Sequence, residues 1–390
     1  MTMPPESSAP TLSPMDNEMP VRWLHRLRLV PPNELGTVRR AVFLALLAWL
    51  PIVIWTVTSR RLGNIDPSES LLQHYGVHVR CLLAIPLLIL AEGPVQTMLQ
   101  KIVQQFHFSG IAPSGPGSAF NSLIAEVRRA RDGTMPWIVV LGAAFTWAVT
   151  NHPSNHDDAM NWAVAADGDL GFGGWWFSYV ARPIFIALVL GWVWRVLLVT
   201  WCFWRISRLD LSLVPAHPDR TGGMGFLAKL PRAFALVTFV LSATISSHWA
   251  HEIVIHGAKL DSFKMPALLF VVLWTVYLLL PLLVFAPTLF AARSHAVAAY
   301  AALVGRQGRL LHRRWILGET VEDETILEAP GIGVVADAAS MYEAVSKMRL
   351  VPIGGKTLLY IAVPMALPFI VVASLQIPFL ELLMKLAKAL

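Results

Sequence analysis

Seven apolar runs dominate the sequence and restrict what the chain can fold into. They cover residues 41–58, 81–99, 136–151, 178–204, 233–251, 267–291 and 357–380. A helix that crosses a bilayer needs about 20 predominantly apolar residues. Only 14% of the residues are charged and 55% are hydrophobic, whereas soluble domains carry about 25% charged residues. The sequence therefore predicts an all-α integral membrane protein with about seven transmembrane helices in a bundle.

Basic residues alternate between the loops and predict the orientation. The segment before the first run and the loops after the second, fourth and sixth runs are rich in Lys and Arg, whereas the loop at 152–177 has none. The loop after the first run is an exception, with Arg60, Arg61 and Arg80. Because basic loops stay in the cytoplasm, we expect an inner-membrane protein with a cytoplasmic N terminus. The net charge of +6 is then a topology signal, and no nucleic-acid partner is expected.

The chain divides into four regions by composition. Residues 1–20 are a Pro- and Ser-rich tail expected to be disordered, 21–290 hold the first six spans, 291–356 form a cytoplasmic helical loop, and 357–390 combine a final span with an amphipathic tail. The final run contains three prolines, Pro364, Pro368 and Pro378, and proline kinks helices. This segment therefore either spans once or is broken and re-entrant, which leaves the side of the C terminus open.

Glu92 in the second apolar run and Arg195 in the fourth form a pair of charges deep within predicted spans. An ionisable group within a span is expensive, so it faces the interior of the bundle and finds a partner. We expect these two side chains to approach each other or to line a shared polar cavity. One interpretation is an intramembrane path for protons or ions. The other is a structural ion pair.

Histidines gather on the side predicted to be outside. The fifth run ends in His248-x-x-His251-Glu252, and the loop after the third run contains His152 and His156. Imidazole and carboxylate groups are ligands for Zn or Cu, and helical neighbours three or four residues apart present two ligands to one ion. One interpretation is a metal site at the outer face. The alternative is ordinary interfacial histidines that form hydrogen bonds or respond to external pH.

A glycine-rich loop joins the fourth and fifth runs. It contains His217, Asp219, Arg220, Gly222 and Gly223 within LVPAHPDRTGGMGFL. Glycine N–H groups with an arginine can cradle a phosphate, but the loop lacks the GK[ST] of a P-loop. Clusters of Pro, Asp and Gly are first of all typical of turns. We therefore expect a tight cytoplasmic turn.

Three segments carry a resemblance to a known family. HPDRTGGMGFL between two spans, ADAASMYEAVSKMRLVP before the last span and the Pro-rich final segment are similar to an uncharacterised family of bacterial multi-pass inner-membrane proteins. The resemblance implies a membrane protein of bacterial origin and assigns no role to any residue.

Three functional hypotheses follow from these features. The first is a channel- or transporter-like protein that uses the polar residues Glu92 and Arg195. The second is a membrane metalloprotein, a hydrolase or a redox protein. The third is a non-enzymatic sensor or scaffold that docks a partner on residues 291–356. No nucleophile–base pair or cofactor fingerprint argues for an enzyme. Besides the lipid bilayer, a homo-oligomer and an unknown solute or protein partner stay open.

Overall fold

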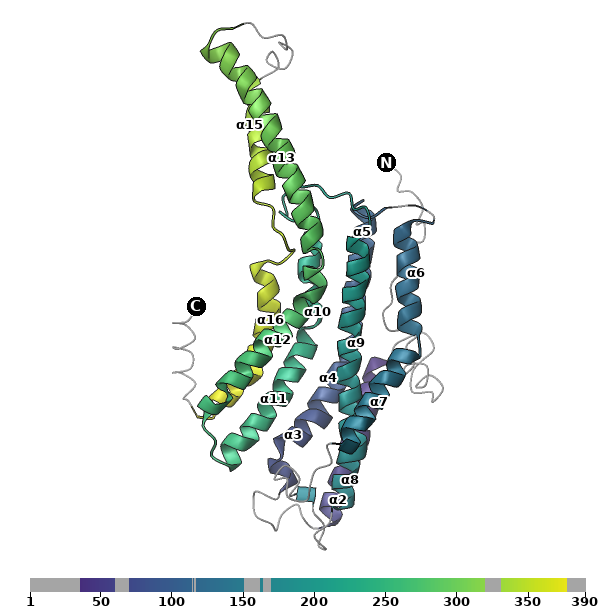
Figure 1. Ribbon diagram of the computed structural model, residues 1–390. Coiled ribbons are helices and arrows are strands. Elements are labelled where there is room, and N and C mark those ends of the chain that lie inside the picture. The colour runs from purple at the N-terminus through teal and green to yellow at the C-terminus, as the bar shows by residue number, and fades with distance from the viewer. Residues whose placement is uncertain are drawn as a thin grey trace.

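The computed structural model of the protein describes residues 36–59, 70–113, 115, 117–150, 162–163, 170–319 and 331–376. Over these residues the chain is a multi-pass bundle of α-helices (Figure 1). The tail at 1–20 and the amphipathic segment expected after residue 376 lie outside the described residues.

About seven helical segments are long and apolar enough to cross a membrane. Six of them are α2 (Thr37–Thr58), α3 to α5 (Tyr75–Phe108), α6 with α7 (Ala119–Thr150), α8 with α9 (Phe172–Ser207), the helix Leu260–Leu283, which contains α12 (Lys264–Leu283), and α16 (Gly355–Ala373). The seventh is a pair bent by 40°, in which Gly225–Ala233 leads into α11 (Ala235–Ile255). The predicted fold class is therefore confirmed.

Two of the long segments are subdivided next to prolines. The second consists of α3 (Tyr75–His78), a π-helical turn at Val79–Ala84, α4 (Ile85–Leu90) and α5 (Glu92–Phe108), and the fourth of α8 (Phe172–Trp176), a π-helical turn at Phe177–Ala181 and α9 (Arg182–Ser207). Pro86 and Pro183 each open the helix that follows a π-helical turn. Because proline lacks an N–H group and its ring clashes with the carbonyl four residues earlier, the preceding turn widens.

The last apolar run forms one continuous helix as far as the structure describes it. Pro364 and Pro368 lie inside α16 without interrupting it. The two prolines remove the N–H donors for the carbonyls four residues earlier, those of Tyr360 and Pro364. The Ser242 hydroxyl of α11 donates to the nearby backbone carbonyl of Met365 at 2.6 Å and ties α16 to α11. Pro378 lies outside the described residues, so the re-entrant alternative concerns only the chain beyond α16.

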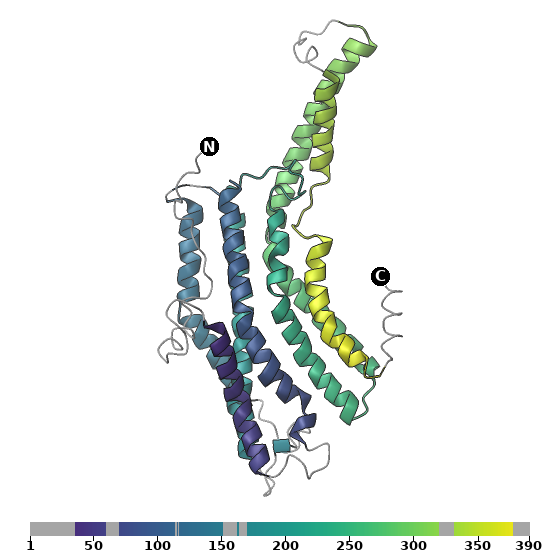
Figure 2. The same cartoon turned by 180° about the vertical axis from the view of Figure 1, so that it is seen from behind.

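The connections between segments alternate between the two ends of the bundle (Figures 1 and 2). The described parts of the loops at 109–113, 208–224 and 347–354 meet at one end. The starts of α3, α8 (Phe172–Trp176) and α12 lie at the other. Towards the first end, α6 (Ala119–Asp132) packs beside α9, and α7 (Met135–Thr150) continues it along the bundle. The chain therefore crosses the bundle repeatedly, as a multi-pass protein requires.

A helical hairpin projects beyond the bundle at the first of these ends (Figure 1). Its helices are α13 (Ala286–Leu311), which follows α12 after a break at Val284 and Phe285 and continues into a π-helical turn at His312–Ile316, and α15 (Gly331–Ser346). The two helices pack against each other along their length. We call this hairpin the arm and the end that bears it the arm end.

The interior and the outer surface of the bundle are both apolar. Phe106, Phe203 and Phe285 form an interlocked aromatic cluster, with ring centroids 5.6 to 6.3 Å apart. On the outside, Leu269 and Leu273 of α12 are each 60% exposed. A soluble surface seldom shows such continuous apolar faces, whereas a lipid-facing helix requires them. Lipid is therefore the solvent for these faces.

Candidate functional site

A buried ion cluster joins three helices. The Glu92 carboxylate of α5 accepts hydrogen bonds from Arg40 Nη1 of α2 at 2.7 Å and from Arg195 Nη2 of α9 at 2.9 Å. A second Arg40 nitrogen lies 3.4 Å from the same carboxylate. The three side chains are only 4%, 1% and 7% exposed, in the order Arg40, Glu92, Arg195. Glu92 is therefore clamped between two guanidinium groups.

The helices place these residues on their buried faces. On α2, Arg40 is in line with Ala48, Ile52 and Thr56, each one or two turns apart, because residues four apart share a helix face. The Arg195 guanidinium also lies 4.8 Å from the ring centroid of Trp192. A π face favours a cation over it, so the aromatic wall adds to the ion pair in holding Arg195.

The structure brings Glu92 and Arg195 together and adds a third member. Arg40 directly precedes the first apolar run, where a basic residue predicts topology. The signal for its burial is its spacing of 8, 12 and 16 residues from Ala48, Ile52 and Thr56, which lie on the buried face of α2. A cavity beside α9 is lined by Leu99, Val103 and neighbouring residues, and Glu92 does not line it. A role of the cluster in transport stays a prediction.

Asp219 organises the glycine-rich loop at the arm end. Its carboxylate accepts hydrogen bonds from the backbone N–H groups of Thr221 at 2.8 Å, Gly223 at 3.1 Å and Gly225 at 2.7 Å. The imidazole Nδ1 of His217 lies 2.9 Å from the same carboxylate. Partial burial acts to raise the pKa of Asp219, but the three N–H groups outweigh it and hold that pKa below its usual value. The loop is thus folded around one carboxylate.

This arrangement corrects the phosphate cradle considered for the loop. The N–H groups of Gly223 and Gly225 point to the Asp219 carboxylate, so they are not available to an external phosphate. Gly222 and Gly223 have φ of +66° and +95°, a region that glycine adopts without a steric penalty. The loop is the tight turn that Pro, Asp and Gly clusters predict.

The same loop is tied to the base of the arm. Arg220 has a φ of +57°, which is uncommon for a residue with a Cβ. Its carbonyl accepts a hydrogen bond from the backbone N–H of Arg349 at 2.7 Å. Arg349 belongs to the segment that joins α15 to α16, so the strained turn and the arm base are fixed to each other.

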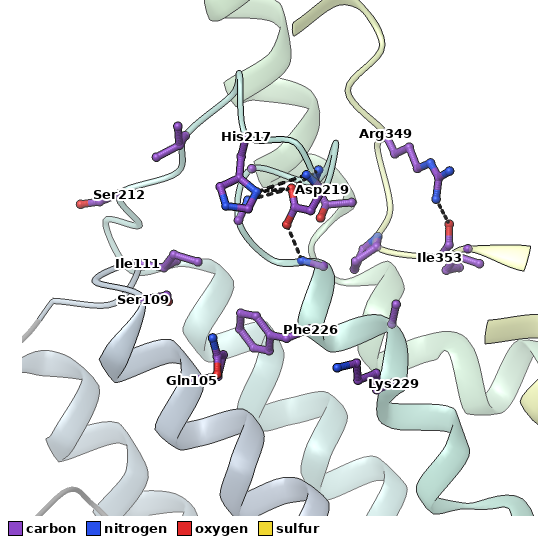
Figure 3. A pocket seen from close by; sticks show the side chains of 18 residues that line it. Gln105, Ser109, Ile111, Ser212, His217, Asp219, Phe226, Lys229, Arg349 and Ile353 are labelled. Atoms are coloured by element: carbon purple, nitrogen blue, oxygen red, sulfur yellow. Dashed lines mark hydrogen bonds and ion pairs between the residues drawn. The ribbon is translucent and has the colours of Figure 1, made fainter. Parts of the chain in front are cut away.

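A cavity of about 540 Å³ opens between this loop, the end of α5 and the arm base (Figure 3). Gln105 and Ser109 line it from α5 and the residue after it, Lys229 from the turn before α10 (Leu230–Ala233), and Arg349 from the arm base. Asp219 and His217 form the wall opposite Gln105 and Phe226. The cavity therefore joins parts of the chain that are far apart in sequence.

Of the residues expected to bind metal, the structure describes His248, His251 and Glu252 on α11. His248 is exposed, whereas His251 is buried and its Nδ1 lies 3.0 Å from the carbonyl oxygen of Gln73. Its ring stacks on His74 with 4.8 Å between centroids. His74 was not among the candidates. The sequence indicates its proximity to His251 only through its position before a span, on the same predicted side of the membrane.

The metal hypothesis therefore rests on residues that the structure does not place. His152 and His156 lie outside the described residues. Within the described part of the chain, no group of three or more His, Cys, Asp and Glu side chains could hold a metal ion. Glu252 lies one position after His251 and does not complete such a group. A Zn or Cu site that includes the 152–156 segment stays a prediction.

Comparisons with models of protein families, with curated proteins and with solved structures return no match to this chain. The resemblance to a family of bacterial inner-membrane proteins therefore stays a prediction, and function has to be argued from the geometry.

Proposed function

We propose that this multi-pass membrane protein is a non-enzymatic docking component, which holds the arm at the cytoplasmic face for a soluble protein partner. The observation that carries the proposal is the arm itself, a hairpin of two helices that extends past the other helices of the bundle (Figure 1). A helix that extends past the bundle gains little from packing on it and exposes its surface to other molecules.

The surface of the arm supports a partner with an acidic docking face. Residues 286–316 contain five Arg and no Asp or Glu. The exposed cations near the tip are Arg306, Arg309, Arg313 and Arg314. Trp315 and Ile316 beside them are 48% and 68% exposed. Arginine and aromatic side chains are the residues that most often dominate binding at interfaces, and complementary charge steers the partner to them.

The orientation supports a cytoplasmic partner. The described loops at the arm end carry many Lys and Arg, among them Arg205, Arg208 and Arg220, whereas Lys259 and Lys264 lie at the opposite end. Basic loops remain on the cytoplasmic side of the membrane. This charge distribution supports a cytoplasmic position for the arm, which is the orientation expected from the sequence.

The buried cluster supports docking over transport. Arg40 and Arg195 both contact the Glu92 carboxylate directly, and all three side chains are at most 7% exposed. A dry cluster of this kind is suited to fix α2, α5 and α9 in one arrangement, because breaking it would leave a charge unpaired in a medium of low dielectric constant. No observation on the described residues favours a transported solute.

Site-specific photo-crosslinking in intact cells tests the proposal. A photoreactive amino acid replaces Trp315 or Met341 on the arm, and Leu273 on the lipid-facing side of α12 serves as the control position. We expect a protein adduct at both arm positions and not at Leu273. The double substitution Arg309→Glu with Arg313→Glu should reduce the adduct at least tenfold, whereas Lys259→Glu at the opposite end should leave it unchanged. Absence of an adduct from the arm, or adducts insensitive to charge reversal, would rule the proposal out.

A further inference from the structure

The cavity at the arm base has a wall of mixed chemistry that suits a small organic molecule. Its volume of about 540 Å³ lies within the range of about 300–1,000 Å³ that is typical of small-molecule sites. Phe226, Ile111 and Ile353 contribute apolar surface. Gln105 and Ser109 add polar groups on the side of α5 (Figure 3). Such a site combines an apolar contact area with a few groups that fix orientation.

The charge of the wall is positive. Lys229 and Arg349 are the two cationic residues among the described residues that line the cavity, not counting His217. Asp219 is the acidic residue among the lining side chains, and its carboxylate already accepts hydrogen bonds from three backbone N–H groups and contacts His217. The carboxylate is thus directed into its own loop, and the two cations set the local potential.

Both cations retain donors for a ligand. An arginine side chain has five N–H donors and a lysine has three. In Arg349, Nη1 donates to the Ile353 carbonyl at 3.2 Å, which holds the guanidinium at the cavity rim and uses one of its donors (Figure 3). The planar fork of a guanidinium matches the oxygen atoms of a phosphate or carboxylate.

We propose that this cavity binds a small organic anion, whose phosphate or carboxylate group contacts Lys229 and Arg349 and whose body packs on Phe226 and Ile353. The ligand touches two parts of the chain at once, because Lys229 belongs to the start of the fifth span and Arg349 to the arm base. Removal of either cation therefore weakens binding, although the two residues are 120 positions apart.

Calorimetric titration of the purified full-length protein in detergent tests this site. The probes are AMP, which carries a phosphate on a nucleoside with a flat aromatic base, citrate, which carries carboxylates, adenosine and inorganic phosphate. We expect saturable binding of AMP or citrate that weakens at least tenfold in Lys229→Gln and in Arg349→Gln. If AMP binds more tightly than citrate, two controls apply. Adenosine lacks the negative charge and inorganic phosphate lacks the organic part of the ligand, so each should bind at least tenfold more weakly than AMP.

Two further variants keep the outcome decisive. Lys356→Gln removes a cation at the start of α16 that does not line the cavity, and it should leave the affinity unchanged. Arg349→Lys retains the charge and should weaken binding less than Arg349→Gln, which separates a ligand contact from a folding defect. No saturable binding of any probe to the wild type, or equal loss in Lys356→Gln and Lys229→Gln, would overturn the proposal.

Discussion

At the scale of single residues, we expect the largest loss of stability when one carboxylate oxygen of Glu92 is replaced by an amide nitrogen. Glu92→Gln leaves Arg40 and Arg195 buried without their anion. Removing one partner of a buried ion pair destabilises a protein by about 3–5 kcal/mol. We expect a large fall in the apparent melting temperature of the detergent-solubilised protein, measured at a fixed heating rate because membrane proteins often unfold irreversibly.

Glu126→Gln is the matched control for this change. Glu126 also pairs with an arginine, Arg205, but the two side chains are 42% and 38% exposed. Exposed ion pairs contribute about 0–1 kcal/mol, so this variant should melt within a few degrees of the wild type. Equal effects of the two substitutions would show that Glu92 is not paired inside the bundle.

Asp219 gives a second prediction at this scale, which depends on pH. Its pKa is held below the ordinary value because three N–H groups bind the carboxylate more strongly than partial burial disfavours it. A carboxyl group with a lowered folded pKa stabilises the protein above the unfolded pKa of about 3.9 and loses that effect as the pH falls through the folded pKa. The order of the loop should therefore be constant above about pH 5 and decline below about pH 4.

Hydrogen exchange can measure this contribution. In Asp219→Asn one carboxylate oxygen becomes an amide nitrogen that cannot accept a hydrogen bond, so a bond worth about 1 kcal/mol or more is lost. The amides of Gly223 and Gly225 should then exchange roughly tenfold faster at neutral pH, as a loss of about 1.4 kcal/mol predicts. Asp210→Asn, an exposed carboxylate of the same inter-span loop, should not change them. Unchanged protection in Asp219→Asn would contradict the role assigned to this residue.

At the scale of helical elements, the start of α8 packs so closely on α2 that only glycine fits. A Cβ at Gly173 would lie 2.4 Å from the indole ring of Trp55. Gly173→Ala should therefore destabilise the protein by about 1–3 kcal/mol, the usual effect of overpacking. Gly142→Ala in α7 meets no atom within 4 Å and should be neutral or stabilising, since alanine favours helices by up to about 1 kcal/mol. Melting curves of the two variants should shift in opposite directions.

The elements also show what the sequence could and could not predict. The spans were predictable because lipid requires long apolar runs, and helices are formed where those runs occur. Arg40 was not recognised as a partner of Glu92, since a basic residue at the edge of a run is equally typical of a topology signal. The position of Asp219 as the hydrogen-bond acceptor at the centre of its loop could not be predicted. It depends on the φ angles of Arg220, Gly222 and Gly223, which no periodic pattern encodes.

At the scale of the whole molecule, the two ends of the bundle should lie on opposite sides of the membrane, with the arm in the cytoplasm. The basic charge of the arm end supports this orientation. It can be tested by placing one reactive cysteine at each end. Ser340 on α15 and Ser262 beside α12 are both exposed, and the native Cys81 and Cys202 are buried, so the background reaction should be low.

The first experiment uses cells in which a membrane-impermeant maleimide reaches the outer surface of the membrane that holds the protein but does not cross that membrane. The reagent should label Ser262→Cys and not Ser340→Cys. In inverted membrane vesicles the result should reverse. The expectation follows from the energy of transferring charge, because the arginines near the tip of the arm would each have to cross the hydrocarbon layer if the arm were outside. Labelling of Ser340→Cys in intact cells would place the arm outside and exclude a cytoplasmic partner. Labelling of both cysteines from one side would contradict a bundle whose two ends are separated by a bilayer.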